Sequence, residues 1–188
     1  MMNLIVSAPS GSGKTTILKE MFKIFPDVFG FSVSATTRKP RAGEKDKVDY
    51  YFISEEEFKD KIQRGEFLEY EQVYQGLYYG TLKSEIERIE SDGHKVIFDV
   101  DVKGGVNIKE KLKNNCCSVF IMPPDIKTLE ERLIRRNTET PETIKKRIDR
   151  ATMELQYSDQ FDYIVINDDL NTAINEMKNI IQSRVLSE

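Results

Sequence analysis

Short apolar runs alternate with longer amphipathic stretches along the whole chain. Runs rich in β-branched and aromatic residues predict core strands at residues 4–8, 31–34, 96–100, 118–122 and 163–167. Apolar positions at helical spacing predict helices at residues 13–25, 54–64, 82–92, 102–113, 126–136, 141–157 and 170–186. Strands that alternate with helices in this way are typical of a parallel sheet covered by helices, so we predict an α/β fold.

Two of the predicted helices carry clear start signals. Ser54 precedes Glu57 by three residues, the spacing of a capping box, and Thr140 precedes a proline, Pro141, that suits the first helical position. No internal repeat or Gly/Ser linker interrupts the pattern. A chain of 188 residues can bury one good core but is short for two independent domains, so we expect one compact unit.

Composition limits the class of protein further. The apolar fraction is 39%, and the net charge of −4 argues against a nucleic-acid or membrane-surface protein. No apolar run approaches 18 residues, and the first residues lack the basic segment and cleavage site of a signal peptide. Cys116 and Cys117 are neighbours, which suits buried reduced thiols, and His94 is the only histidine. We expect a cytoplasmic protein that uses neither zinc nor a catalytic histidine.

The strongest motif is the glycine-rich stretch APSGSGKT at residues 8–15, which follows a predicted strand and opens a predicted helix. Gly11 and Gly13 allow main-chain amides to turn inward around phosphate oxygens, and the helix N-terminus adds partial positive charge. Lys14 can reach the β- and γ-phosphates of a nucleoside triphosphate, and the Thr15 hydroxyl suits Mg²⁺. The candidate ATP ligands from this segment are Pro9, Ser10, Gly11, Ser12, Gly13, Lys14, Thr15 and Thr16.

Two carboxylates stand at the end of a predicted buried strand. Asp99 and Asp101 lie on the same side of the extended chain, because side chains alternate along a strand. Asp99 could hold the Mg²⁺ shell through water, with Asp101 directed at a second ligand. Capping of the helix that follows is the alternative explanation for Asp101, although it does not account for both residues.

A basic loop follows the second predicted strand. Arg38 and Arg41 could clamp one monophosphate, because guanidinium groups bind phosphate through paired hydrogen bonds, and a tyrosine hydroxyl of the following stretch DYYF at 49–52 could add a third donor. A solvated basic loop is the alternative. Farther along, Glu69 could accept hydrogen bonds from both N1–H and the exocyclic amine of guanine, whereas adenine would leave it buried and unpaired. For Glu69, a surface salt bridge is the alternative.

Two predicted helices, at residues 126–136 and 141–157, carry arginines beside their apolar stripes. Arg136 continues the apolar row of the first helix, and Arg147 borders the stripe of the second. Phosphoryl transfer needs positive charge around the migrating group, and an anionic monophosphate needs no general base. We therefore predict an arginine lid, with a solvated charged face as the alternative.

With these residues placed, the chain resembles the guanylate kinase family over nearly its whole length. The motifs that carry the resemblance are the phosphate loop, FGFSVS at 29–34, TTRKPRAGE at 36–44, YYGT at 78–81, FDVD at 98–101 and VINDD at 165–169. The resemblance implies a P-loop kinase with a parallel-sheet core flanked by helices at 1–34, 82–125 and 158–188. It also implies a small mixed α/β GMP-binding subdomain at about 35–81 and a helical lid at about 126–157.

The activity that this resemblance implies is transfer of the γ-phosphoryl group of MgATP to GMP, and also to dGMP, in purine nucleotide metabolism by a monomer or homodimer. The residues it implies for GMP are Ser34, Arg38, Arg41, Tyr50, Glu69, Tyr79, Thr81, Asp99 and Asp101. Those it implies for catalysis are Lys14, Arg38, Arg136 and Arg147. Arg132 and Asn167 would join the ATP site, and Mg²⁺ would be held by Thr15 and, through water, by Asp99.

Two positions depart from the family pattern, since Ala8 stands where glycine is usual and Thr81 where serine is common. Ala8 is tolerable in the loop unless its φ is positive. Two other functions stay open. One is a kinase for AMP, UMP or dTMP, and the other is a non-catalytic scaffold domain that binds phosphopeptides. Such scaffold domains typically lose the phosphate-loop lysine, whereas this chain retains Lys14.

Overall fold

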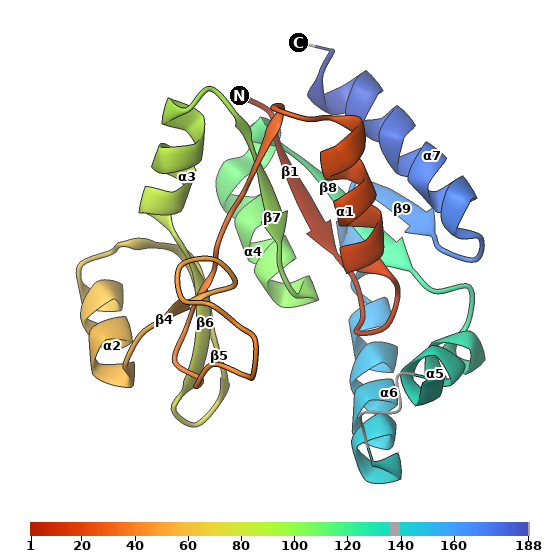
Figure 1. The fold of residues 1–188 in the computed structure, drawn as a ribbon, viewed down its shortest axis with the longest axis horizontal. Coiled ribbons are helices and arrows are strands. Elements are labelled where there is room, and N and C mark those ends of the chain that lie inside the picture. Colours follow the sequence, from red (N-terminus) through yellow and green to blue (C-terminus); the bar gives the residue numbers. More distant parts are fainter. Residues whose placement is uncertain (136–139, 188) are drawn as a thin grey trace. The chain divides into compact units, whose positions relative to one another are not determined.

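The computed structural model describes residues 1–135 and 140–187. Its main sheet has five strands in the order β2-β7-β1-β8-β9, and a second sheet has four in the order β4-β3-β6-β5 (Figure 1). The strands of the main sheet are β1 (Asn3–Ser7), β2 (Phe29–Phe31), β7 (Lys95–Asp99), β8 (Cys116–Met122) and β9 (Tyr163–Ile166). Those of the second sheet are β3 (Ala35–Thr36), β4 (Tyr51–Phe52), β5 (Phe67–Tyr74) and β6 (Leu77–Leu82). The predicted α/β fold is confirmed.

The described helices match the predicted amphipathic stretches closely. They are α1 (Lys14–Ile24), α2 (Glu55–Gln63), α3 (Lys83–Ser91), α4 (Val102–Leu112), α5 (Ile126–Arg135), α6 (Pro141–Leu155) and α7 (Leu170–Ile180). Short 3-10 turns follow α4 and α6, at η1 (Lys113–Asn115) and η2 (Ser158–Gln160), and α7 continues as one π-helical turn, η3 (Ile181–Val185). None of these helices is both long and apolar enough to span a lipid bilayer.

The chain divides into two compact units, one made of Met1–Pro26 with Asp99–Glu188 and the other of Asp27–Phe98. In the first unit, β1 pairs in parallel with β8, and β8 with β9. Every residue of β1 is buried. Helix α4 packs on β1 and β8 while α1 packs against α7, and Figure 1 shows these two sets on opposite faces of the strands. The segment between β1 and α1, which holds the phosphate motif, therefore lies at the carboxyl edge of these strands.

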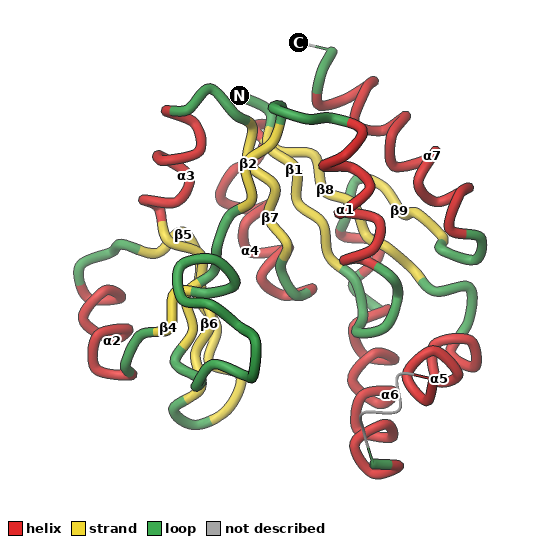
Figure 2. The backbone as a smooth tube through the Cα atoms, in the orientation of Figure 1, coloured by secondary structure: helices red, strands yellow, loops and turns green. Residues whose placement is uncertain are grey.

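The second unit contains β2, β7, α3 and the whole four-stranded sheet. In that sheet β3 pairs in parallel with β4 and antiparallel with β6, and β6 forms an antiparallel pair with β5. Its core is an apolar cluster of Ala35, Phe58, Phe67 and Leu82, in which the rings of Phe58 and Phe67 stack with centroids 4.3 Å apart. The loop at 37–50 joins β3 to β4 and is drawn green in Figure 2.

Both predicted N-caps are confirmed. Ser54 Oγ accepts a hydrogen bond from the Glu57 main-chain N–H at 3.0 Å, and Thr140 Oγ1 accepts one from the Thr143 N–H at 3.3 Å. These side chains satisfy donors that the first turn of a helix otherwise leaves unpaired.

The predicted strand at 31–34 is wrong in its bounds. Strand β2 ends at Phe31, and although the Ser32 N–H still donates to the Ile97 carbonyl of β7 at 3.1 Å, the next two residues leave the main sheet. The Val33 N–H donates to the Glu85 carboxylate at 3.0 Å, and the Ser34 carbonyl accepts from the Tyr51 N–H at 2.9 Å. The apolar pattern cannot reveal this change, because it reports which side chains are buried and not which partner the backbone bonds.

Candidate active site

The phosphate loop has the backbone geometry that its glycines predict. Gly11 and Gly13 have φ of 97° and 96°, a left-handed conformation that favours glycine. A Cβ on Gly13 would lie 2.2 Å from Asn167 Nδ2, so close packing excludes a side chain there as well. Ala8 is not among the non-glycine residues of positive φ in the described chain, and its departure from the family pattern is therefore tolerated.

Asn167 and Arg132 lie against this loop. Asn167 is 5% exposed and donates from Nδ2 to the Ser12 carbonyl at 2.7 Å. Arg132 donates from Nη2 to the Asn167 carbonyl at 2.9 Å. Its Nη1 is buried and has no hydrogen-bond partner among the described residues. An unpaired buried cationic donor beside a phosphate loop is suited to an anionic ligand.

Lys14 begins α1 and is held at the carboxyl end of β7. Its ammonium forms an ion pair with Asp99 and donates to the Val100 carbonyl at 2.9 Å. The Lys14 and Asp99 side chains are both about one-fifth exposed, at 19% and 21%. The sequence predicted both residues for the phosphate and metal site, and the structure brings them together.

Helices α5 and α6 pack on each other through the predicted apolar stripes. Leu129, Leu133 and Ala151 form a buried cluster, and Ile144 and Ile148 pack against it. The same stripe approaches the phosphate loop, since a Cβ on Gly11 would lie 3.0 Å from Leu129 Cδ1.

An arginine of α6 reaches the phosphate loop directly. Arg147 Nη1 donates to Ser10 Oγ at 3.1 Å. A predicted catalytic cation of α6 thus lies beside the loop that the sequence assigned to ATP. The other predicted lid cation, Arg136, lies outside the described residues.

The Asp101 carboxylate contacts both a helix backbone and an arginine. Its Oδ1 accepts from the Gly104 N–H at 2.8 Å and so caps α4, which is the alternative role considered from the sequence. Its Oδ2 lies 3.4 Å from Arg150 Nη2, and Arg150 also pairs with Glu154 at 2.7 Å. Burial raises the pKa of Glu154 above its ordinary value. The sequence did not single out Arg150 or Glu154, because their spacing alone is that of an ordinary exposed ion pair on a helix.

Residues predicted to hold the acceptor phosphate gather in the second unit. Arg38 pairs with both oxygens of Glu44, each at 2.6 Å, and this bond raises the pKa of Arg38. The guanidinium carbon of Arg38 lies 4.8 Å from the centroid of the Tyr50 ring, and the Tyr50 and Tyr79 rings meet edge to face at 6.0 Å. The Arg41 main-chain N–H also donates to Glu44, at 2.7 Å, while the Arg41 side chain is exposed.

Glu69 and Thr81 face each other across β5 and β6. They are paired in register, are 5% and 1% exposed, and are joined by a 2.9 Å hydrogen bond from Thr81 Oγ1 to Glu69 Oε1. The alternative of a surface salt bridge for Glu69 is wrong, because the carboxylate is buried. Ser34 is half-buried at the start of the same sheet. The hydrogen bond from Thr81 fixes the orientation of the carboxylate.

Two carboxylates of the second unit were missed from the sequence, Glu44 and Glu85. Glu44 stands six residues after Arg38 in a turn closed by the Glu44 N–H and the Arg41 carbonyl at 3.1 Å. The sequence did contain a signal for this role, because Glu44 stands close to both Arg38 and Arg41 along the chain. Glu85 lies in the first turn of α3, where an acidic residue normally attracts no attention because it complements the helix dipole.

The guanylate kinase family model matches residues 1–184. The chain belongs to the guanylate kinase family. It is 46% identical over 178 residues to a guanylate kinase of Porphyromonas gingivalis, with 95% of each chain covered. It is 49% identical to one of Bacteroides fragilis, with 90% of this chain and 83% of that one covered.

A solved structure of the same family agrees with the fold. The crystal structure of guanylate kinase from Anaplasma phagocytophilum matches with a TM-score of 0.73 and 29% identity. The match covers 97% of this chain and 85% of that one. The resemblance stated from the motifs is therefore confirmed.

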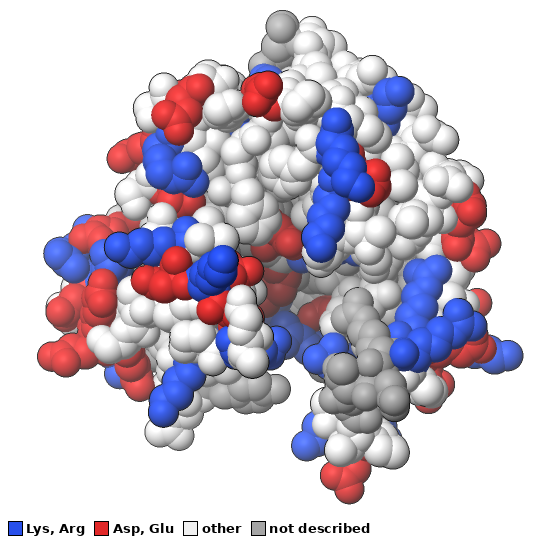
Figure 3. Space-filling model, in the orientation of Figure 1, with Lys and Arg blue, Asp and Glu red and all other residues white. Residues whose placement is uncertain are grey.

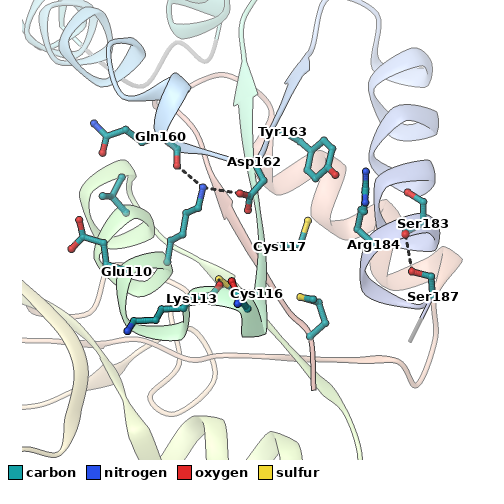
Figure 4. Close-up of a pocket in the computed structure, with 14 residues that line it drawn as sticks. Glu110, Lys113, Cys116, Cys117, Gln160, Asp162, Tyr163, Ser183, Arg184 and Ser187 are labelled. Atoms are coloured by element: carbon teal, nitrogen blue, oxygen red, sulfur yellow. Dashed lines mark hydrogen bonds and ion pairs between the residues drawn. The ribbon is translucent and has the colours of Figure 1, made fainter.

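A separate hollow of about 760 Å³ lies at the opposite end of the strands, where β8 and β9 begin (Figure 4). Lys109 crosses it to pair with Asp162 at 2.8 Å, and burial raises the pKa of Cys116 and Cys117 to about 11 and 12. These thiols are therefore protonated and unreactive at neutral pH, as expected for buried strand residues.

On the face shown in Figure 3, basic and acidic side chains are interspersed.

Proposed function

We propose that the chain transfers the γ-phosphoryl group of MgATP directly and in line to GMP, giving ADP and GDP, and that dGMP is also an acceptor. Membership in the guanylate kinase family makes the chain an ATP:GMP phosphotransferase. The observation that carries the choice of guanine is the buried Glu69 carboxylate, oriented by Thr81 in the unit that also displays Arg38.

On the donor side, the residues of the first unit bind ATP and stabilise the migrating group. The amides at Ser10–Thr16 would surround the phosphates, and Lys14 would exchange its contacts with Asp99 and Val100 for phosphate oxygens. Arg147, already beside Ser10, would neutralise charge that develops in the transition state. Arg136 would do the same, Arg132 would support it, and Asn167, which fastens the loop through Ser12, would also border adenine.

On the acceptor side, the residues of the second unit bind GMP. Arg38 and Arg41 would hold its phosphate with help from Tyr50 and Tyr79, and Ser34, Glu69 and Thr81 would contact guanine. Asp101 would lie beside the acceptor, with Asp99 near it. The phosphate needs no general base, because a monophosphate is already anionic at neutral pH.

Magnesium fits the donor set of the phosphate loop. Thr15 offers an exposed hydroxyl and Asp99 a partly exposed carboxylate, and Mg²⁺ typically takes one or two protein oxygens with the rest from phosphates and water. Bound there, Mg²⁺ would neutralise phosphate charge, with Thr15 as a direct ligand and Asp99 acting through water. We further propose a cytoplasmic monomer or homodimer that binds neither nucleic acid nor membrane, with a core, a GMP-binding segment at about 35–81 and a lid at about 126–157.

A coupled assay across GMP, dGMP, AMP, UMP and dTMP tests the proposal. We expect GMP to give the highest kcat/KM, and faster turnover of AMP would overturn the guanine assignment. Glu69→Gln should lower kcat/KM for GMP by about 10- to 100-fold, because the amide cannot accept both guanine donors. Its matched control is Glu56→Gln, the same change at an exposed position of α2.

A further inference from the structure

Glu85 is a buried carboxylate for which the proposed reaction has no role. It lies in the first turn of α3 and is 2% exposed. Its Oε2 accepts from the Val33 N–H at 3.0 Å and its Oε1 from the Tyr51 hydroxyl at 2.6 Å. Arg88, one turn later, donates to both oxygens at 2.9 and 3.0 Å. An acidic residue that merely complements a helix dipole would not need to be buried with three partners.

These bonds form a closed ring around Ser34. The Ser34 carbonyl accepts from the Tyr51 N–H at 2.9 Å, the Tyr51 hydroxyl donates to Glu85, and Glu85 accepts from Val33, the residue before Ser34. Ser34 is therefore tied on its amino side through Val33 and on its carbonyl side through Tyr51. Tyr50 directly precedes Tyr51. The hydrogen bonds that hold Tyr51 therefore also restrict the backbone at Tyr50.

The ring stands where the chain enters and leaves the four-stranded sheet. Residues 32–34 lead from β2 into β3, and β6 passes directly into α3 at Leu82 and Lys83. Glu85 therefore joins Val33, where the chain enters the four-stranded sheet, to α3, where the chain leaves it.

The two titratable groups that bond each other in this ring, Glu85 and Tyr51, each keep one protonation state at neutral pH. Burial would raise the pKa of Glu85, but the hydrogen bonds from Arg88, Tyr51 and Val33 outweigh it and lower that pKa. Burial and the adjacent carboxylate raise the pKa of Tyr51 to about 12. The carboxylate therefore always accepts and the tyrosine always donates.

We propose that Glu85 is a positioning residue of the acceptor site, which holds Ser34 and Tyr50 in the arrangement that binds the guanine nucleotide. This inference rests on the assignment of Ser34 and Tyr50 to the GMP site. It predicts that Glu85 affects recognition of the acceptor without touching it, and that ATP is unaffected.

The test compares three variants in steady-state kinetics, with KM measured separately for GMP and for ATP. Glu85→Gln keeps the shape of the side chain but turns one acceptor oxygen into a donor, which breaks one side of the ring. Tyr51→Phe removes one bond with little change of volume and is the variant to use if the first does not fold. Glu87→Gln is the matched control, the same change at an exposed position of α3 that lies outside the ring.

We expect Glu85→Gln and Tyr51→Phe each to raise KM for GMP by about five- to tenfold, the effect of about one hydrogen bond, with KM for ATP within about twofold of the parent. Glu87→Gln should leave both KM values within about twofold. An unchanged KM for GMP in either ring variant, or an equal rise for ATP and GMP, would overturn the proposal. If the parent enzyme did not phosphorylate GMP at all, the proposed function itself would fail, and the two failures are thus distinguishable.

Discussion

At the scale of single residues, Glu44 holds the Arg38 side chain in place within the loop at 37–50. The carboxylate receives two hydrogen bonds from Arg38 and one from the Arg41 main chain. The Arg38 side chain is only 14% exposed and lies over the Tyr50 ring. Because Glu44 fixes the guanidinium plane in advance, Arg38 would lose less rotational freedom in binding the predicted phosphate.

This contact has a pH signature. The hydrogen bond from Arg38, with a second from the Arg41 N–H, lowers the pKa of Glu44 from 4.5 to about 2. A lowered pKa means that the ionised carboxylate stabilises the folded state above about pH 4.5, and that this contribution is lost as the pH falls toward 2. Thermal unfolding should therefore show a Tm gap between the parent and Glu44→Gln that is constant near neutrality and closes on acidification. Glu56→Gln serves as the control, and a gap that persists at the lowest pH contradicts this account.

At the scale of elements, the start of α4 combines a helix cap with an ion pair. Asp101 caps the helix through Oδ1 and meets Arg150 through Oδ2. Such double use explains why the sequence left both roles open, since a carboxylate at a strand end and a capping residue have the same local pattern.

Two substitutions separate these roles of Asp101. Asparagine caps helices as well as aspartate does but carries no charge, so Asp101→Asn should keep Tm within about 2 °C and raise KM for GMP. Asp101→Ala should also destabilise the protein by about 1 kcal/mol, because it leaves the Gly104 N–H without its acceptor. Calorimetric Tm and KM are measured for both. If Asp101→Asn had the same KM for GMP as the parent, Asp101 would act only as a helix cap.

At the scale of the whole molecule, the predicted ATP and GMP residues belong to different compact units, apart from Asp99 and Asp101. Lys14, Arg132 and Arg147 lie in the first unit, and Arg38 and Glu69 lie in the second. If these assignments hold, the contacts to ATP and to GMP are made largely by separate sets of side chains. Changes in one set should affect the binding of one substrate.

The variant Lys14→Met tests this separation. We expect kcat to fall by about 10²- to 10³-fold, because a preorganised charge at the transferred group is lost. Binding of GMP alone, measured by calorimetry, should stay within about twofold, since its predicted contacts other than Asp99 and Asp101 are in the other unit. Lys19→Met, at an exposed position of α1, is the matched control. Loss of GMP binding along with kcat would show that the two sites are not independent.

Much of this protein can be predicted from residue pattern because the relevant interactions are local. The phosphate loop needs glycines, a lysine and a hydroxyl within eight residues between a strand and a helix, and helix caps need one side chain at one offset. The stripes of Leu129, Leu133, Ile144 and Ile148 were likewise readable from periodicity, and the described core confirms them.

Contacts between distant segments could not be read in this way. Lys14 with Asp99, Asn167 with Ser12, and Glu85 with Val33 join residues 85, 155 and 52 positions apart. A hydrogen bond depends on where two backbones meet in space, and apolar periodicity records only burial. Residue types and spacing therefore established the chemistry, while the folded chain established which partner orients each reactive group.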